Sequence, residues 1–206
     1  MGGGEIIPPM KYDREKSLVE ALLREARQEA GSFEDPNAMA GVETGVDVLV
    51  ELSGRRVGIQ VTELDTGGVP GTARANENKL KQETAALGHS TYMAWSENKP
   101  ANLISAVAGA ISRKARIAAR HAFAGLDEVW LLVSCGVPDL GAIASTFVMT
   151  PWLTVEALDQ ATKATLSPSR YHRAFIHPIL SVERCLYDWN RERAAWSKLT
   201  TPTPQR

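Results

Sequence analysis

The spacing of apolar residues along the chain predicts its helices. Apolar residues recur at intervals of three and four over residues 13–30, which is typical of an amphipathic helix, and Gly31 supplies the stop. A second stripe of this period predicts a long helix over residues 101–123. Two further helices are expected over residues 72–87 and over residues 153–165, the latter capped by Thr154.

The strongest local pattern predicts a β-hairpin. Two β-rich runs, residues 46–52 and 57–63, surround the short Ser53-Gly54-Arg55-Arg56 turn. Because strand side chains alternate, Gln60 and Thr62 share one face of the second strand, and the opposite face is expected to be core. Gln60 and Thr62 themselves are expected to be half-exposed.

Other strands complete the expected fold. Residues 127–135 lack alternation, which favours a central strand covered on both faces. Shorter extended segments are expected over residues 146–149, 174–179 and 184–187. The order of elements predicts an α/β fold with a central mixed sheet that contains the hairpin and is flanked by helices. We expect one domain over residues 12–199, between a flexible lead-in (1–11) and a flexible tail (200–206).

The amino-acid composition agrees with the predicted α/β fold. Of the 206 residues, 44% are hydrophobic and 23% are charged, values that are typical of globular proteins. The longest apolar run, residues 129–133, is far shorter than the ~20 residues of a bilayer crossing, so no membrane association is expected. Only two cysteines occur, which is too few for a disulfide framework, and we expect a cytoplasmic protein.

The distribution of charge is more informative than its sum. Residues 1–70 carry seven basic and thirteen acidic side chains, whereas residues 71–125 carry eight basic and three acidic ones. An acidic region followed by a basic one is consistent with a cation site beside a surface that binds a polyanion. Mutual neutralisation of the two regions in the fold explains the pattern equally well.

Two features suggest where a cation could bind. Glu15 lies in the apolar stripe of the first helix, where a carboxylate is costly unless it is paired, binds a cation or lies at a frayed helix start. Asp47 begins the hairpin, and Gln60 lies on the adjacent strand, so their oxygens could converge on Mg²⁺ or Mn²⁺. Alternatively, Asp47 is an ordinary acid at the start of a strand or in a turn, with no role in cation binding.

With these residues the chain resembles the PD-(D/E)XK restriction-endonuclease-like nucleases. The family has an acidic residue on an N-terminal helix, an acid that opens a hairpin, a Glu/Gln-x-Lys motif, and then a helix and a strand. The matching positions here are Glu15 or Glu20, Asp47, and Gln60-Val61-Thr62, and the resemblance spans residues 12–135. It implies a Mg²⁺-dependent nuclease in which Asp47 and Gln60 hold the metal.

One position departs from that pattern. Thr62 stands where the family has lysine, and threonine supplies no positive charge. The charge could come instead from Lys79, Lys81 or Arg56, or catalysis could be lost on a retained scaffold.

The resemblance also implies a DNA partner. Basic residues after the hairpin are expected to contact phosphates: Lys79, Lys81, Arg113, Arg116 and Arg120. The alternative is a non-catalytic interaction or regulatory protein, such as a defence-system component. That alternative predicts an exposed apolar patch around Trp152, Trp189 and Trp196. A homodimer or a protein partner fits either hypothesis.

Overall fold

The computed structural model describes residues 11–36, 45–64, 100–135, 153–178 and 185–200, and these residues form three helices and seven strands. The helices are α1 (Lys11–Glu25), α3 (Pro100–Ala118) and α4 (Val155–Leu166). The strands are β1 (Ala30–Glu34), β2 (Val48–Leu52), β3 (Arg55–Leu64), β4 (Glu128–Cys135), β5 (Arg173–Pro178), β6 (Cys185–Asn190) and β7 (Ala195–Thr200).

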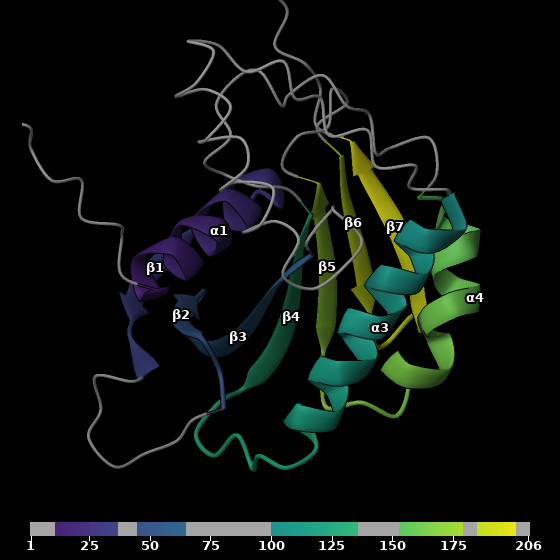
Figure 1. Cartoon of the computed structure of the whole chain (residues 1–206). Helices are drawn as coiled ribbons and strands as arrows, with labels where there is room; N and C mark the ends of the chain where they lie inside the picture. Colours follow the sequence, from purple (N-terminus) through teal and green to yellow (C-terminus); the bar gives the residue numbers. More distant parts are fainter. Residues whose placement is uncertain (1–10, 37–44, 65–99, 136–152, 179–184, 201–206) are drawn as a thin grey trace, which may run out of the picture.

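All seven strands form one mixed sheet, in which their spatial order follows the order of the chain (Figure 1). Strands β3, β4 and β5 are parallel to one another, and the pairs on either side of this centre are antiparallel. The two parallel connections each require a long crossover, which α3 and α4 supply. The expected α/β class, with a mixed sheet, a hairpin and flanking helices, is confirmed.

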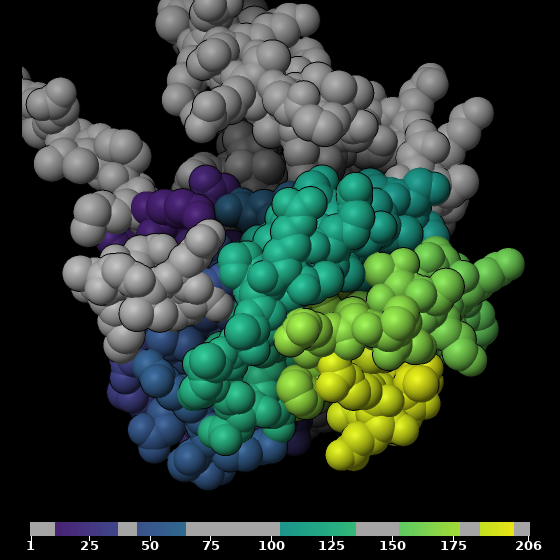
Figure 2. All heavy atoms as spheres, turned by 90° about the horizontal axis from the view of Figure 1, so that it is seen from below, coloured from purple at the N-terminus to yellow at the C-terminus, as the bar shows by residue number. Residues whose placement is uncertain are grey.

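The helices cover both faces of the sheet. Helix α1 packs on one face through Leu18, Val19, Leu22 and Leu23, which join a core cluster with the side chains of β2, β3 and β4. Helices α3 and α4 pack against each other and cover the other face (Figures 1 and 2). Strand β4 lies at the centre and contributes alternate side chains to both clusters, as its uninterrupted apolar run predicts.

The hairpin has a tighter turn than expected. Ser53 and Gly54 alone connect β2 to β3, and both have positive φ angles, 51° and 76°. This conformation is that of a type I′ turn, whose twist matches that of antiparallel strands. Arg55 and Arg56, which we expected in the turn, instead pair with Leu52 and Glu51 as the first residues of β3.

Several other expectations are corrected. Helix α1 ends at Glu25, five residues earlier than predicted, and Ala30, the last residue of the predicted helix, begins strand β1. Strands β1 and β7 were not predicted. Gln60 and Thr62 are not half-exposed but buried, at 2% and 7%, because α3 covers their face of the sheet.

The expected apolar patch of tryptophans does not form from the described residues. Trp189 and Trp196 are 1% and 4% exposed and belong to the core on the α3 side. They are therefore core residues, while Trp152 lies outside the described part of the chain. Other expectations also fall outside it: the helix over 72–87 with Lys79 and Lys81, the strand over 146–149, the lead-in over 1–11 apart from Lys11, and the tail over 200–206 apart from Thr200. Those two residues are not in flexible ends, because Lys11 begins α1 and Thr200 ends β7. Among the described residues, no helix is long and apolar enough to cross a membrane.

The segment that leads into β2 passes close to the end of α3. Gly45 has a φ of 71°, and a Cβ atom added to it would overlap the ring of His121. We expect Gly45→Ala to lower the free energy of unfolding by about 2–4 kcal/mol, from the left-handed backbone and the overpacking together. Chemical denaturation measures the change.

The matched control is Gly54→Ala. Gly54 also has a positive φ, but an added Cβ would meet nothing within 4 Å. The backbone cost therefore remains and the overlap disappears, so this variant should be destabilised by only about 1–2 kcal/mol. Equal losses in the two variants would contradict the steric role of Gly45.

Candidate functional site

The site forms where β3 extends beyond β2. The last register pair of the hairpin joins Val48 to Ile59, whereas β3 continues to Leu64 and, among the described residues, pairs there with β4 alone. Asp47 fills the space beside this free edge, and its carboxylate accepts a hydrogen bond from the Val61 backbone N–H at 2.8 Å. The side chain thus takes the place of a missing strand partner and fixes its carboxylate beside β3.

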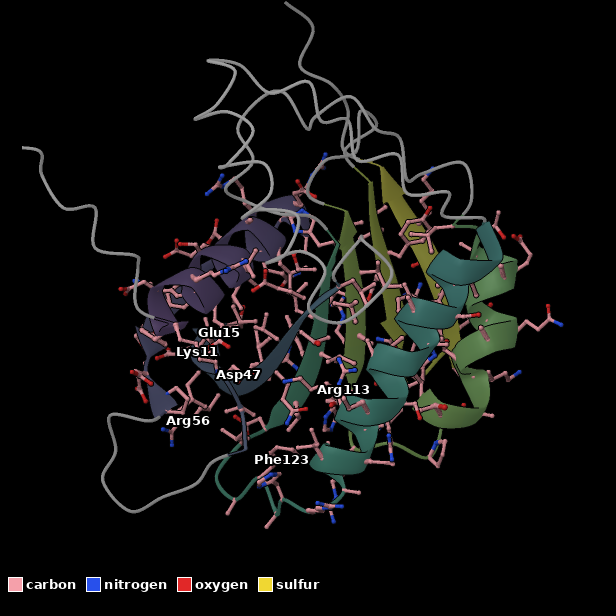
Figure 3. All side chains as sticks on the ribbon, in the orientation of Figure 1. Lys11, Glu15, Asp47, Arg56, Arg113 and Phe123 are labelled. Carbon is pink, nitrogen blue, oxygen red and sulfur yellow. The ribbon has the colours of Figure 1, made fainter. Side chains whose placement is uncertain are left out.

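Helix α1 brings a second carboxylate to Asp47. Glu15 lies in the first turns of α1, and its side chain is only 11% exposed, whereas the Asp47 side chain is 18% exposed. The Lys11 ammonium bridges the two acids, at 3.3 Å from Glu15 Oε1 and 3.6 Å from Asp47 Oδ1. Figure 3 shows Lys11 and Glu15 beside Asp47. The two acids therefore already share one cationic group.

Helix α3 supplies positive charge from the other face of the sheet. Lys114 Nζ lies 3.1 Å from Asp47 Oδ2, and both side chains are 18% exposed. The neighbouring Arg113 donates to Thr62 Oγ1 at 3.4 Å. Two consecutive residues of α3 thus bring cationic groups to Asp47 and to Thr62, the position at which the PD-(D/E)XK nucleases have lysine.

Gln60 is held inside the protein. Its Nε2 donates to the backbone carbonyl of Gly45, and its Oε1 accepts a hydrogen bond from the Tyr171 hydroxyl. Burial and the charge of Asp47 raise the pKa of Tyr171, so its phenol stays protonated and donates. These contacts use both ends of the amide to anchor the segment before Asp47, so the geometry gives Gln60 a supporting position.

The remaining sequence candidates lie apart from this cluster. Glu20 is on the outer side of α1 and pairs with Lys16 at 3.7 Å, so the structure brings Glu15 rather than Glu20 to Asp47. Arg56 pairs with Glu34 at 3.1 Å. It lies on β3 four residues before Gln60, which is roughly 13 Å along the strand. Arg116 lies near the end of α3. Arg120 lies in the turn after it, because the helix predicted to reach residue 123 ends at Ala118, and both arginines are exposed.

Three members of the cluster were not among the predicted site residues: Lys11, Lys114 and Tyr171. A signal existed for Lys11, because it lies four residues before Glu15 and therefore on the same side of a helix. Lys114 and Tyr171 lie 67 and 111 positions from their partners along the chain, and no local pattern indicates contacts of that range.

The acids fit a hard divalent cation. Mg²⁺ is commonly held by one or two carboxylates, with water and substrate phosphate as its other ligands. Glu15 and Asp47 supply two such carboxylates, and the position of Lys11 between them shows that the pair attracts a cation. Within the described ranges, no cluster of three or more histidine, cysteine, aspartate or glutamate side chains offers a closed metal site. The set therefore suits an open site of the Mg²⁺ or Mn²⁺ type.

Glu15 carries an unfavourable charge. The pKa of Glu15 is raised, mainly by burial and next by the nearby Asp47 carboxylate. Lys11 and Lys114 lower this pKa, but by less than the other two causes raise it. The folded protein therefore holds this proton more tightly than the unfolded chain does. The contribution of Glu15 to stability consequently falls as pH rises from the ordinary value of 4.5 through the raised pKa.

We expect Glu15→Gln to stabilise the protein at pH 7 while it weakens cation binding. The rise in thermal midpoint should be about 2 °C, the scale of 0.5–1 kcal/mol in a domain of this length, and should shrink toward pH 4. Differential scanning calorimetry between pH 4 and 8 measures it. Glu20→Gln is the control, since Glu20 makes the same kind of lysine pair on the exposed side of α1. A fall in midpoint specific to Glu15→Gln would contradict this description of its charge.

Comparison of the chain with models of protein families, with curated proteins and with solved structures found no match. The functional argument therefore depends on the geometry of the cluster itself.

Proposed function

We propose that this chain is a Mg²⁺-dependent nuclease-like protein that acts on DNA in the cytoplasm. The observation that carries the proposal is the convergence of Glu15 and Asp47 with the Lys114 ammonium, 3.1 Å from Asp47. Two carboxylates and a lysine are the groups that metal-assisted phosphodiester hydrolysis uses. The order of α1, the β2–β3 hairpin, α3 and β4 also supports the resemblance to the PD-(D/E)XK nucleases.

Each group has a role in the proposed chemistry. Glu15 and Asp47 would hold the metal, which when bound polarises the scissile phosphate and lowers the pKa of a water. Lys114 would orient the attacking water and offset the negative charge of the transition state. Because Lys114 reaches Asp47 from α3, it would replace the charge that Thr62 lacks. Gln60 and Tyr171 would hold Asp47 in position through the Gly45 segment.

The surface of α3 offers a place for the DNA backbone. Arg113, Arg116 and Arg120 are all exposed, and α3 forms a continuous band across the face seen in Figure 2. Arg113 lies next to the cluster, Arg116 lies near the end of α3, and Arg120 lies in the turn that follows the helix. Phosphates bound along this helix would lead directly to the metal site.

This arrangement predicts a defined salt dependence. We expect Arg116→Gln and Arg120→Gln each to reduce the slope of log affinity against log salt concentration by about 0.9 for duplex DNA. Fluorescence anisotropy at several salt concentrations measures the slope. Arg24→Gln is the control, because Arg24 is exposed on α1, on the opposite face of the sheet. Equal changes in all three variants would contradict a binding surface on α3.

The direct test of the proposed function is DNA cleavage. Supercoiled plasmid and single-stranded oligonucleotides are incubated with the protein and Mg²⁺ or Mn²⁺, and with EDTA as the control. Cleavage that requires the metal supports the proposal. Metal and DNA binding without cleavage would indicate a relative that has lost catalysis. Absence of both would contradict the proposal and favour a non-catalytic interaction protein.

A further inference from the structure

The position of α1 on the sheet depends on more than its apolar face. Leu18, Val19, Leu22 and Leu23 set which side of α1 faces the sheet, but these buried contacts begin three residues after Glu15. A directional contact beside Glu15 can therefore refine the placement of its carboxylate.

An ion pair between α1 and β3 provides this constraint. The Arg14 guanidinium pairs with Glu63 Oε2, and the two side chains are 41% and 30% exposed. Arg14 immediately precedes Glu15, and Glu63 follows Val61, whose N–H binds Asp47, by two residues. The pair thus connects the helix beside one acid to the strand that holds the other.

We propose that Arg14 and Glu63 are positioning residues that hold Glu15 against Asp47 at the metal site. This inference depends on the proposed function, because it assigns the pair to the geometry of that same site. Arg14 and Glu63 pair with each other, whereas the Lys11 ammonium pairs with Glu15 and Asp47. Their effect on the cation is therefore indirect.

The sign of the effect distinguishes positioning from simple electrostatics. Removing Arg14 deletes a positive charge near a cation site, so Coulomb's law alone predicts tighter cation binding. If Arg14 instead positions Glu15, its removal lets one ligand move away and weakens binding. The two explanations thus predict opposite changes for one variant.

The experiment titrates Mn²⁺ into the full chain and follows free Mn²⁺ by electron paramagnetic resonance. We expect Arg14→Met to weaken Mn²⁺ binding about tenfold, the lower end of the effect of residues that orient metal ligands. Lys16→Met is the matched control: it removes the same charge two positions along α1, where Lys16 pairs with the exposed Glu20. It should not weaken binding. Unchanged or tighter binding in Arg14→Met would overturn the proposal.

Charge exchange excludes the possibility that Glu63 is itself a ligand. Glu63→Gln should weaken binding as Arg14→Met does, and the double variant Arg14→Glu with Glu63→Arg should restore most of the affinity. Failure of the exchange to restore binding, with the thermal midpoint unchanged, would overturn the positioning role.

A readout without metal separates this inference from the proposed function. Hydrogen exchange of the backbone amides of residues 15–19 should accelerate several-fold in Arg14→Met and Glu63→Gln, but not in Lys16→Met. If the wild-type protein binds no Mn²⁺, the proposed function fails, whereas accelerated exchange would still show that the pair holds α1. Unchanged exchange in both variants would overturn the positioning role whatever the metal result.

Discussion

In the Asp47→Asn variant, we expect Mg²⁺-dependent DNA cleavage to fall at least about hundredfold, because a charged metal ligand is lost. Asparagine keeps an oxygen that can accept from the Val61 N–H, so the hairpin should remain intact. What it removes is the charge that Lys11 and Lys114 share. Initial rates on supercoiled plasmid measure the effect, and circular dichroism checks the fold.

Asp127→Asn is the control for this prediction. Asp127 also precedes a strand, and its Oδ2 accepts from the Arg56 backbone N–H at 2.7 Å. It thus makes the same kind of structural contact as Asp47, but at the start of β4. Cleavage should be unchanged in this variant. A comparable loss in both variants, or an active Asp47→Asn protein, would contradict the catalytic role of Asp47.

The second large effect is expected at Lys114. Lys114→Met should lower the cleavage rate by roughly 10²–10³, the range found when a group that stabilises transition-state charge is removed. The Mn²⁺ affinity should not fall, because Lys114 is a positive charge beside the acids and not a ligand. Single-turnover cleavage and Mn²⁺ titration of the same preparation separate the two quantities.

Arg116→Met provides the comparison for Lys114→Met. It removes one positive charge from α3 two residues further on, at an exposed position. Weaker DNA binding, with an unchanged cleavage rate at saturating DNA, is expected for this variant. If Lys114→Met behaved in the same way, Lys114 would be a phosphate contact and not the replacement for the missing motif lysine.

The elements with buried, periodic side chains could be predicted from the sequence. The β2–β3 hairpin, the central β4 and the Thr154 cap of α4 form as expected, the last with Thr154 accepting from the Ala157 N–H at 3.2 Å. Each has a strong local cause: alternation and a turn, a continuous apolar run, or a capping side chain.

The edge strands could not be predicted in this way. Strand β1 has the sequence Ala-Gly-Ser-Phe-Glu and is exposed at every residue but Phe33, so it lacks a buried face that would reveal it. Within the described part of the chain, strand β7 pairs with β6 alone, and its exposed Leu199 and half-exposed Ser197 break the alternation. Pairing with the neighbouring strand, and not the local pattern, determines these two elements.

For the site, the sequence supplied the acids but not their cationic partners. Glu15 was recognisable as a carboxylate within an apolar stripe, and the structure indeed buries it at 8% exposure. Asp47 was recognisable from its place before the hairpin. Lys114, which reaches Asp47, was not recognisable from the sequence. Its position depends on how α3 crosses the sheet within the connection from β3 to the parallel strand β4.

The central claim is that Glu15 and Asp47 together bind a divalent cation, and calorimetric titration with Mn²⁺ at pH 7.5 tests it most directly. The wild-type chain should bind Mn²⁺, and Asp47→Asn and Glu15→Gln should each weaken that binding by at least about tenfold. Glu20→Gln should bind as the wild type does. No binding by the wild-type chain, or equal binding by all four proteins, would contradict the claim.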